Sequence, residues 1–168
     1  QRLEAAGKLT LRVSISAAVS NLGPIEGIEQ RIRAMGRHPL HGDGAMLRLV
    51  GIKTFLDGGM LTGSAYLREP WGVSRIYAIT DPQYRGVLQI PRERLLPMVR
   101  AATDAGLQFT AHSVGDGAVH LLLDVYGEVA REMWRPLFNA VPAADAPIGH
   151  VTNGVHLPTF LATPMREP

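Results

Sequence analysis

The stretch Gly51-Ile52-Lys53-Thr54-Phe55-Leu56-Asp57-Gly58-Gly59 decides the fold of this chain. It is a run of apolar, β-branched and aromatic residues that stops abruptly in a glycine-containing turn. A second run of the same kind, Phe109-Thr110-Ala111-His112-Ser113-Val114-Gly115-Asp116, follows further along the chain. Such runs are typical of parallel strands that deliver a side chain to a site at their carboxyl ends. Lys53 and His112 are the unusual polar residues of the two runs, and they are therefore the first candidates for chemistry.

Composition sets the broad class of the protein. With 168 residues, 46% hydrophobic and 19% charged, the chain reads as an ordinary globular domain with a core. Its net charge is +2 with scattered arginines, so we expect no nucleic-acid partner. No apolar run reaches the roughly 20 residues that span a bilayer, so we expect no membrane partner. The absence of cysteine excludes disulfides and thiolate metal sites and fits a reducing compartment, which predicts a cytoplasmic location.

The pattern of apolar residues predicts three strand–helix units. We expect strands at 8–16, 46–56 and 107–112, followed by helices at 25–35, 91–105 and 116–134. The first strand should have one polar face, and the second should be buried on both faces apart from Arg48 and Lys53. Pro97 either kinks the second helix or lies at its first position, in which case that helix begins near Leu96.

Alternation of strands and helices implies a parallel sheet with right-handed crossovers. Three units are too few to close an eight-stranded barrel, so the predicted fold class is α/β: a partial (β/α)8 barrel with an irregular, extended tail after Pro136. The long segment 57–89 is rich in glycine and aromatic residues, which favours a lid or binding loop. Because the chain opens on Gln1 rather than methionine, close to the first strand, we expect it to be a piece of a longer protein.

A lysine within a buried strand must be paired, neutral or chemically modified, because an isolated buried ammonium is very costly. One interpretation is an ion pair between Lys53 and Asp57 on the same strand face. The other is carboxylation of Lys53 by carbon dioxide, which gives an anionic carbamate able to bridge two divalent cations. His112 would then donate an imidazole to one cation, although a structural role is the simpler interpretation of a lone histidine. Asp116 would cap the following helix and would hydrogen-bond around the site or meet the substrate.

A pair of histidines, His38 and His41, lies in a loop with His-x-x-His spacing. This spacing can chelate a metal, but loop histidines of this kind are usually solvated, which is the interpretation we favour.

Residues 51–58, together with Gly63-Ser64-Ala65-Tyr66-Leu67 and Tyr84-Arg85-Gly86, resemble the metal-dependent amidohydrolases, in the branch of N-substituted formamide deformylase-like enzymes. Residues 105–119 resemble the next strand of that family, with its His-x-x-Gly-Asp signature, and the resemblance covers about residues 1–127. It implies a (β/α)8 barrel with a small flanking β-domain, in which Lys53 is a carboxylated metal bridge and His112 a metal ligand. It also implies a divalent cofactor, zinc, and hydrolysis of a carbon–nitrogen bond in a small-molecule substrate, with Asp116 in support.

The sequence departs from that family at several positions. The His-x-His pair of the first strand, a further ligand histidine and the general-base aspartate of the last strand are absent. We therefore expect an incomplete site that binds metal weakly.

The tail resembles another family. Residues 127–134 and 147–159, which include His-Val-Thr-Asn-Gly-Val-His, are similar to bacterial α-glucan (glycogen) phosphorylases over about 127–165. On this resemblance His150 and His156 are not a metal pair. We expect an amidohydrolase-like part at 1–126 and a phosphorylase-like tail at 127–168, joined as in a chimeric reading frame. The alternatives to a hydrolase are a non-catalytic remnant that self-associates through open sheet edges, and a phosphorylase fragment.

Overall fold

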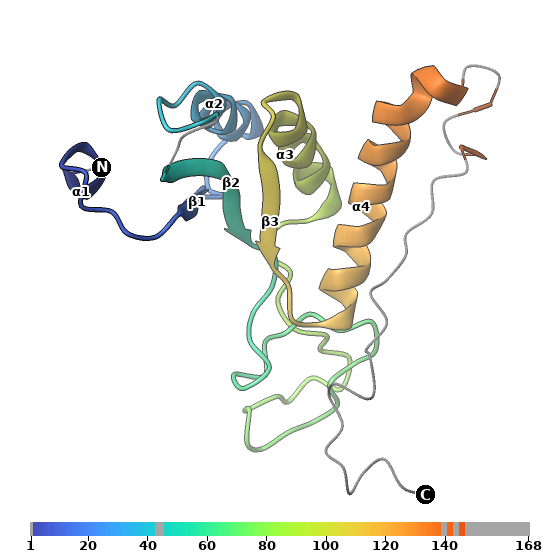
Figure 1. Ribbon diagram of the computed structural model, residues 1–168. Coiled ribbons are helices and arrows are strands. Elements are labelled where there is room, and N and C mark those ends of the chain that lie inside the picture. Colours follow the sequence, from blue (N-terminus) through green and yellow to red (C-terminus); the bar gives the residue numbers. More distant parts are fainter. Residues whose placement is uncertain (1, 43–45, 139–140, 143–144, 147–168) are drawn as a thin grey trace, which may run out of the picture.

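The computed structural model describes residues 2–42, 46–138, 141–142 and 145–146 (Figure 1). Its centre is a parallel sheet in the order β1-β2-β3, formed by Val13–Ala18, Leu47–Phe55 and Gln108–His112. Strand and helix alternate along the chain, and the sheet stays open. The predicted α/β class is confirmed, as a partial barrel of parallel strands.

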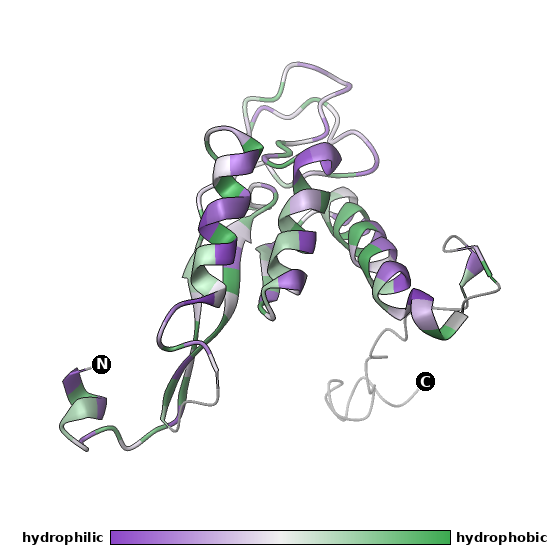
Figure 2. Cartoon of the chain, turned by 90° about the horizontal axis from the view of Figure 1, so that it is seen from above, coloured by the Kyte–Doolittle hydropathy of each residue, from purple (hydrophilic) through white to green (hydrophobic). Residues whose placement is uncertain are grey.

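The helices lie mainly on one side of this sheet. They are α1 (Arg2–Ala5), α2 (Ile25–Gly36), α3 (Arg92–Asp104) and α4 (Asp116–Trp134), followed by the 3-10 turn η1 (Arg135–Phe138). Ile28, Ile32, Leu95 and Met98 are fully buried between the helices and the strands, and they form the centre of the core. Figure 2 shows hydrophobic and hydrophilic residues interleaved along α2, α3 and α4, as the apolar periodicity of these segments predicts.

The predicted start of β1 and the alternative start of α3 differ from the structure. β1 begins at Val13 rather than Lys8, because the partner strand β2 begins only at Leu47, which pairs with Val13. Most of β1 is exposed on both sides, so the expected alternation of buried and polar faces is wrong for this edge strand. α3 runs from Arg92 through Pro97, so the alternative start near Leu96 is also wrong.

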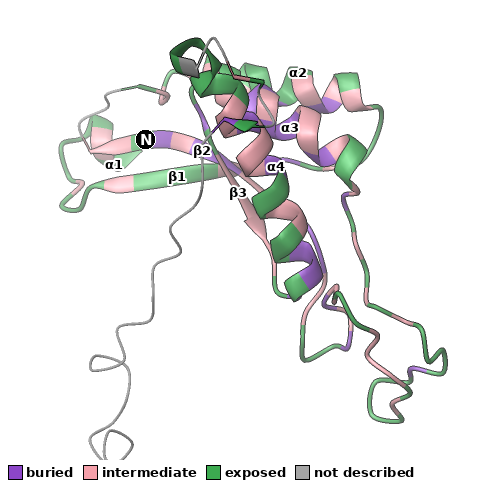
Figure 3. Cartoon of the chain, turned by 90° about the vertical axis from the view of Figure 1, so that its right-hand side faces the viewer, coloured by how far each residue is buried: buried purple, intermediate pink, exposed green. Residues whose placement is uncertain are grey.

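The sheet has one covered and one open face, which corrects the expectation that β2 is buried on both sides (Figure 3). Ile52, Thr54 and Leu56 are buried on the helix side. Because side chains alternate along a strand, Lys53 and Phe55 emerge on the opposite side. There the side chain of Phe55 remains 54% exposed, since no helix or strand of the described chain lies against it. This open face corresponds to the interior of a closed barrel.

The segment 57–89 is a loop that packs on itself at the carboxyl ends of β2 and β3 (Figure 1). Its two arms are joined by backbone hydrogen bonds, for example from Leu67 N to Arg85 O at 2.7 Å and from Trp71 N to Tyr84 O at 2.8 Å. The indole of Trp71 donates to Ala65 O at 2.8 Å. The loop is therefore an ordered structure, as its aromatic content predicts, and its function as a lid stays a prediction.

The predicted boundary between residues 126 and 127 lies in the middle of α4, and the division into two parts stays a prediction. The tail with His150 and His156 lies outside the described residues. Within the described chain, no helix combines the length and apolar character needed to cross a bilayer.

Candidate functional site

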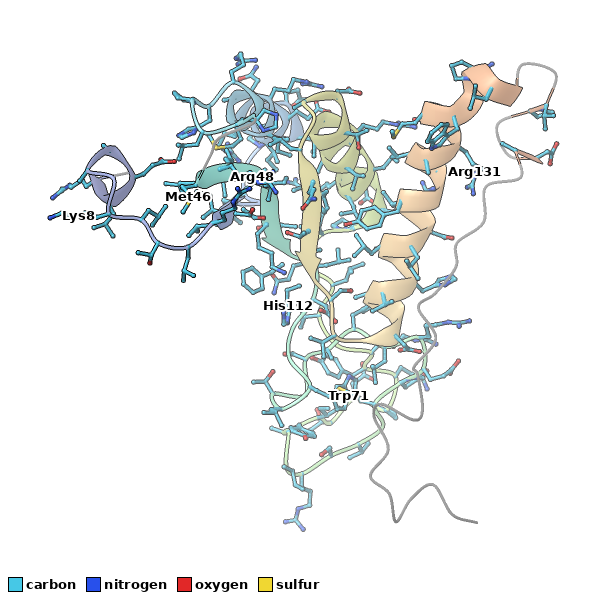
Figure 4. All side chains as sticks on the ribbon, viewed as in Figure 1. Lys8, Met46, Arg48, Trp71, His112 and Arg131 are labelled. Atoms are coloured by element: carbon cyan, nitrogen blue, oxygen red, sulfur yellow. The ribbon has the colours of Figure 1, made fainter. Side chains whose placement is uncertain are left out.

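Lys53 and His112 lie on the same face of the sheet. In the parallel pairing of β2 and β3, Lys53 is opposite Thr110 and Phe55 is opposite His112. Residues two apart on a strand share a face, so all four side chains emerge on the open side. The rings of Phe55 and His112 confirm this arrangement, with centroids 5.3 Å apart. Figure 4 shows His112 where β3 ends, above the loop that carries Trp71. The sheet thus places the two candidate residues on one face of adjacent strands, and their role as metal ligands stays a prediction.

Lys53 does not form the predicted ion pair with Asp57. The ion pairs of the described residues are Arg33–Glu29, Arg92–Glu128, Arg100–Glu128 and Arg100–Glu132. Lys53 is only half-buried, because its face of the sheet is open. The premise of a deeply buried ammonium is therefore wrong for this chain by itself, and partial exposure to water lowers the cost of the charge.

Asp57 binds backbone instead. Its side chain is 1% exposed, and its two carboxylate oxygens accept three main-chain N–H groups. Oδ2 accepts from Tyr66 N at 3.0 Å and from Gly115 N at 2.7 Å, and Oδ1 accepts from Val114 N at 3.0 Å. These hydrogen bonds compensate the carboxylate for the loss of water. Asp57 therefore joins the end of β2 to the long loop and to the turn after β3.

Asp116 lies one residue inside α4 rather than at its cap. The N-cap is Gly115, which makes no side-chain hydrogen bond. The exposed carboxylate of Asp116 accepts from Arg68 N of the long loop at 3.0 Å. The N-terminal turn of α4 is satisfied by Tyr66 O, which accepts from Gly117 N at 3.1 Å and from Ala118 N at 3.3 Å. In this arrangement Asp116 binds the loop, and its predicted catalytic role stays a prediction.

The donors on the open face fit part of a metal centre. A carboxylated lysine and an imidazole are both suitable ligands for a divalent cation, and Lys53 and His112 share one face and adjacent strands. Among the residues that the structure describes, no three His, Cys, Asp or Glu side chains lie together as a metal site. That Lys53 and His112 are metal ligands stays a prediction.

The loop histidines make local hydrogen bonds. Nδ1 of His38 accepts from Leu40 N at 3.1 Å, and Nδ1 of His41 lies 3.2 Å from Leu49 O. Both side chains are half-buried, so they are bound to backbone rather than solvated as expected.

Sequence reasoning missed the role of Asp57 and the contact between Phe55 and His112. The signal for Asp57 was the Asp-Gly-Gly turn directly after a strand, because an aspartate at such a turn readily accepts backbone N–H groups. The aromatic contact follows from strand register, which one strand alone does not reveal.

The fold and the polar strand ends define a class of protein: a part of a parallel β/α barrel with candidate ligands at the carboxyl ends of its strands. The model of the amidohydrolase family matches residues 1–140. The chain belongs to the amidohydrolase family.

Two curated proteins are similar to parts of the chain. It is 34% identical over 84 residues to Protein LONG AFTER FAR-RED 3 of Arabidopsis thaliana, a match to 50% of this chain and 13% of that protein. It is 37% identical over 49 residues to maltodextrin phosphorylase of Thermococcus litoralis, which is 29% of this chain and 6% of that enzyme.

Two solved structures share the fold. An uncharacterized metal-dependent hydrolase from Pyrococcus horikoshii is 27% identical with a TM-score of 0.58, over 77% of this chain and 23% of that one. Another from Pyrococcus furiosus is 24% identical with a TM-score of 0.58, over 77% of this chain and 24% of that one. The chain thus spans less than a quarter of the length of each hydrolase.

Proposed function

We propose that this chain is part of a metal-dependent hydrolase that cleaves carbon–nitrogen bonds of a small-molecule substrate, as in the N-substituted formamide deformylase-like branch. The observation that carries the proposal is that Lys53 and His112 share one sheet face in a chain of the amidohydrolase family. The similarity to a metal-dependent hydrolase at 27% identity supports it. The lack of cysteine supports a cytoplasmic location.

In this proposal Lys53, once carboxylated, and His112 would hold a divalent cation, zinc, at the carboxyl ends of β2 and β3. The cation would supply Lewis-acid polarisation of the scissile group. The ring of Phe55 packs beside the His112 ring, with centroids 5.3 Å apart and planes tilted by 44°. Asp116 keeps the loop attached through Arg68 N, so that the loop lies beside the substrate. In this proposal further donors and a general base complete the site, because the described residues bring no cluster of three His, Cys, Asp or Glu side chains together.

The chain has two lysines, Lys8 and Lys53, which makes the carbamate directly testable. We expect a 13C carbamate resonance when the protein is equilibrated with 13C-labelled bicarbonate and Zn²⁺. It should disappear in Lys53→Ala and persist in Lys8→Ala, the matched control on an exposed residue. A resonance that survives Lys53→Ala would assign the carbamate to Lys8 or to the terminal amine, and would contradict the proposal.

Thermal unfolding gives a second test of the metal. A cation that binds only the folded state stabilises it by about 2.7 kcal/mol at 100 times its dissociation constant. For a chain of this size each kcal/mol raises the melting temperature by about 2–4 °C. We expect Zn²⁺ with bicarbonate to raise the melting temperature of the wild type and of Lys8→Ala, and to leave Lys53→Ala and His112→Ala unchanged. A wild type indifferent to Zn²⁺ would favour a non-catalytic chimeric remnant.

The second candidate is a fragment of an α-glucan phosphorylase. It is favoured by the 49-residue similarity to maltodextrin phosphorylase. Retention of the chain on immobilised maltodextrin, with release by free maltodextrin, would support it. Passage through the column without delay would count against it.

A further inference from the structure

We infer that Asp57 is a positioning residue for His112. This inference rests on the proposed metal site, because it assigns the group that holds one of its ligands in place. His112 ends β3, and without a restraint beyond it the last residue of a short strand would fray. Asp57 supplies the restraint from the neighbouring strand end.

The main chain that follows the Cα atom of His112 is fixed by the segment Leu56–Asp57. His112 O accepts from Leu56 N at 2.9 Å, which continues the ladder of β2 and β3 by one bond. Two and three residues further on, Val114 N and Gly115 N donate to the carboxylate of Asp57. Three hydrogen bonds therefore hold the turn 112–115, directly after the Cα atom that carries the imidazole.

The same carboxylate also holds the long loop. Oδ2 accepts from Tyr66 N together with Gly115 N, so the loop and the turn after β3 meet at one oxygen atom. The Cβ position of Gly115 lies only 1.9 Å from Tyr66 O, which shows how closely the two main chains approach. A change at Asp57 therefore acts on the loop and on the turn after His112 together.

Asp57 itself is not a ligand in this inference. Its oxygens point into the turn and are occupied by main-chain donors, and the side chain is 1% exposed. The buried carboxylate thus acts on the site through the backbone. Partners that orient a metal ligand typically contribute 10–100-fold to metal affinity.

The test compares Asp57→Asn with Asp81→Asn. An asparagine at 57 can still accept Tyr66 N and Gly115 N with its single oxygen, but its NH₂ group then opposes Val114 N–H. Asp81 is an exposed aspartate of the same loop, and its carboxylate accepts one main-chain N–H, from Gln83 at 2.8 Å. Asp81→Asn is therefore the matched control: it makes the same aspartate-to-asparagine change without touching the turn after β3. If Asp57→Asn fails to fold, Asp57→Glu, which keeps both oxygens on a longer arm, replaces it.

The readouts are the NMR signals of the His112 imidazole, its nuclear Overhauser contacts with the Phe55 ring, and hydrogen exchange at Val114 and Gly115. We expect Asp57→Asn to weaken the contacts and accelerate exchange at these amides, while amides in α2 keep wild-type protection. Zn²⁺ affinity in bicarbonate should fall about 10–100-fold. Asp81→Asn should match the wild type in every readout.

The outcomes separate the two proposals. If the wild type binds no Zn²⁺, the proposed function fails, and the imidazole and exchange data alone decide the role of Asp57. If Asp57→Asn lowers stability uniformly and leaves the His112 signals as in Asp81→Asn, Asp57 is merely structural and the inference is overturned.

Discussion

The glycines at the start of α4 let the loop's main chain lie directly on the helix. A Cβ at Gly115 would stand 1.9 Å from Tyr66 O and 2.6 Å from Tyr66 N. Gly115 has φ −73° and ψ 145°, which alanine adopts easily, so any cost of a substitution comes from contact rather than from backbone strain. The contact is with main chain, which cannot rotate away as a side chain can.

We expect Gly115→Ala to destabilise the protein by about 1–3 kcal/mol, the usual range for overpacking. The matched control is Gly127→Ala in the same helix, where the new Cβ meets only the flexible Arg131 guanidinium at 3.3 Å. That substitution should stabilise α4 by up to about 1 kcal/mol. Urea unfolding of the two variants measures the sign of each change in the free energy of unfolding. Equal changes in the two variants would contradict this account of the glycines.

Tyr126 makes a pH-dependent contribution to stability. Its hydroxyl donates to Phe109 O, and burial raises the pKa of Tyr126 from its ordinary value of about 10 to about 12. Because the folded-state pKa is the higher one, this contribution is fully present below pH 10 and is lost as pH rises from 10 towards 12. Tyr126→Phe should cost about 1 kcal/mol at pH 7 and should reduce the alkaline loss. Tyr77→Phe, in the long loop, is the control and should keep the wild-type loss of stability at alkaline pH. Denaturant titrations across this pH window measure both variants.

At the scale of elements, α3 and α4 are joined by arginine–glutamate pairs. Arg100 bonds to Glu128 at 3.0 Å and also to Glu132, while Arg92 bonds to Glu128. The hydrogen bond with Glu132 raises the pKa of Arg100, so this cation stays charged at every ordinary pH. All four side chains are partly exposed, which limits the contribution of each ion pair to the stability of the fold.

Glu128→Gln removes the carboxylate that both arginines share. We expect a loss of about 1 kcal/mol or less at low salt, in the range of exposed ion pairs. The difference from the wild type should shrink in 1 M NaCl, where the Debye length falls to about 3 Å. Glu26→Gln on α2, outside this network, is the control. A difference that does not depend on salt would show that packing, not charge, is lost.

The order of the elements was predictable from the sequence because strand and helix periodicity is a local property. The runs ending at Phe55 and His112, and the helices after them, lie close to where the pattern placed them. The site was predictable only in part. Spacing put Lys53 and Asp57 on one face, but the chain turns after Leu56 and the carboxylate meets main-chain donors from distant segments. Such donors have no signature in the side-chain sequence.

At the scale of the whole molecule, the open face has a consequence for solution behaviour. Phe55 is 54% exposed beside His112, and Leu11 and Ile15 of the edge region are 72% and 38% exposed. The outer edge of β3 borders a groove of about 560 Å³ lined by residues of α3, β3 and α4, including Met133 and Val129. Unpaired strand edges and exposed apolar faces promote association.

We expect the isolated chain to self-associate through this open face. Phe55→Gln should shift the equilibrium towards monomer at little cost in stability, because the ring is already exposed. Leu61→Gln is the control, since Leu61 is 92% exposed in the long loop and is no part of the sheet face. Sedimentation velocity over a concentration series measures the shift. If the wild type and Phe55→Gln are both monomeric at every concentration, the prediction is contradicted. The open face of the sheet is then stable in contact with water alone.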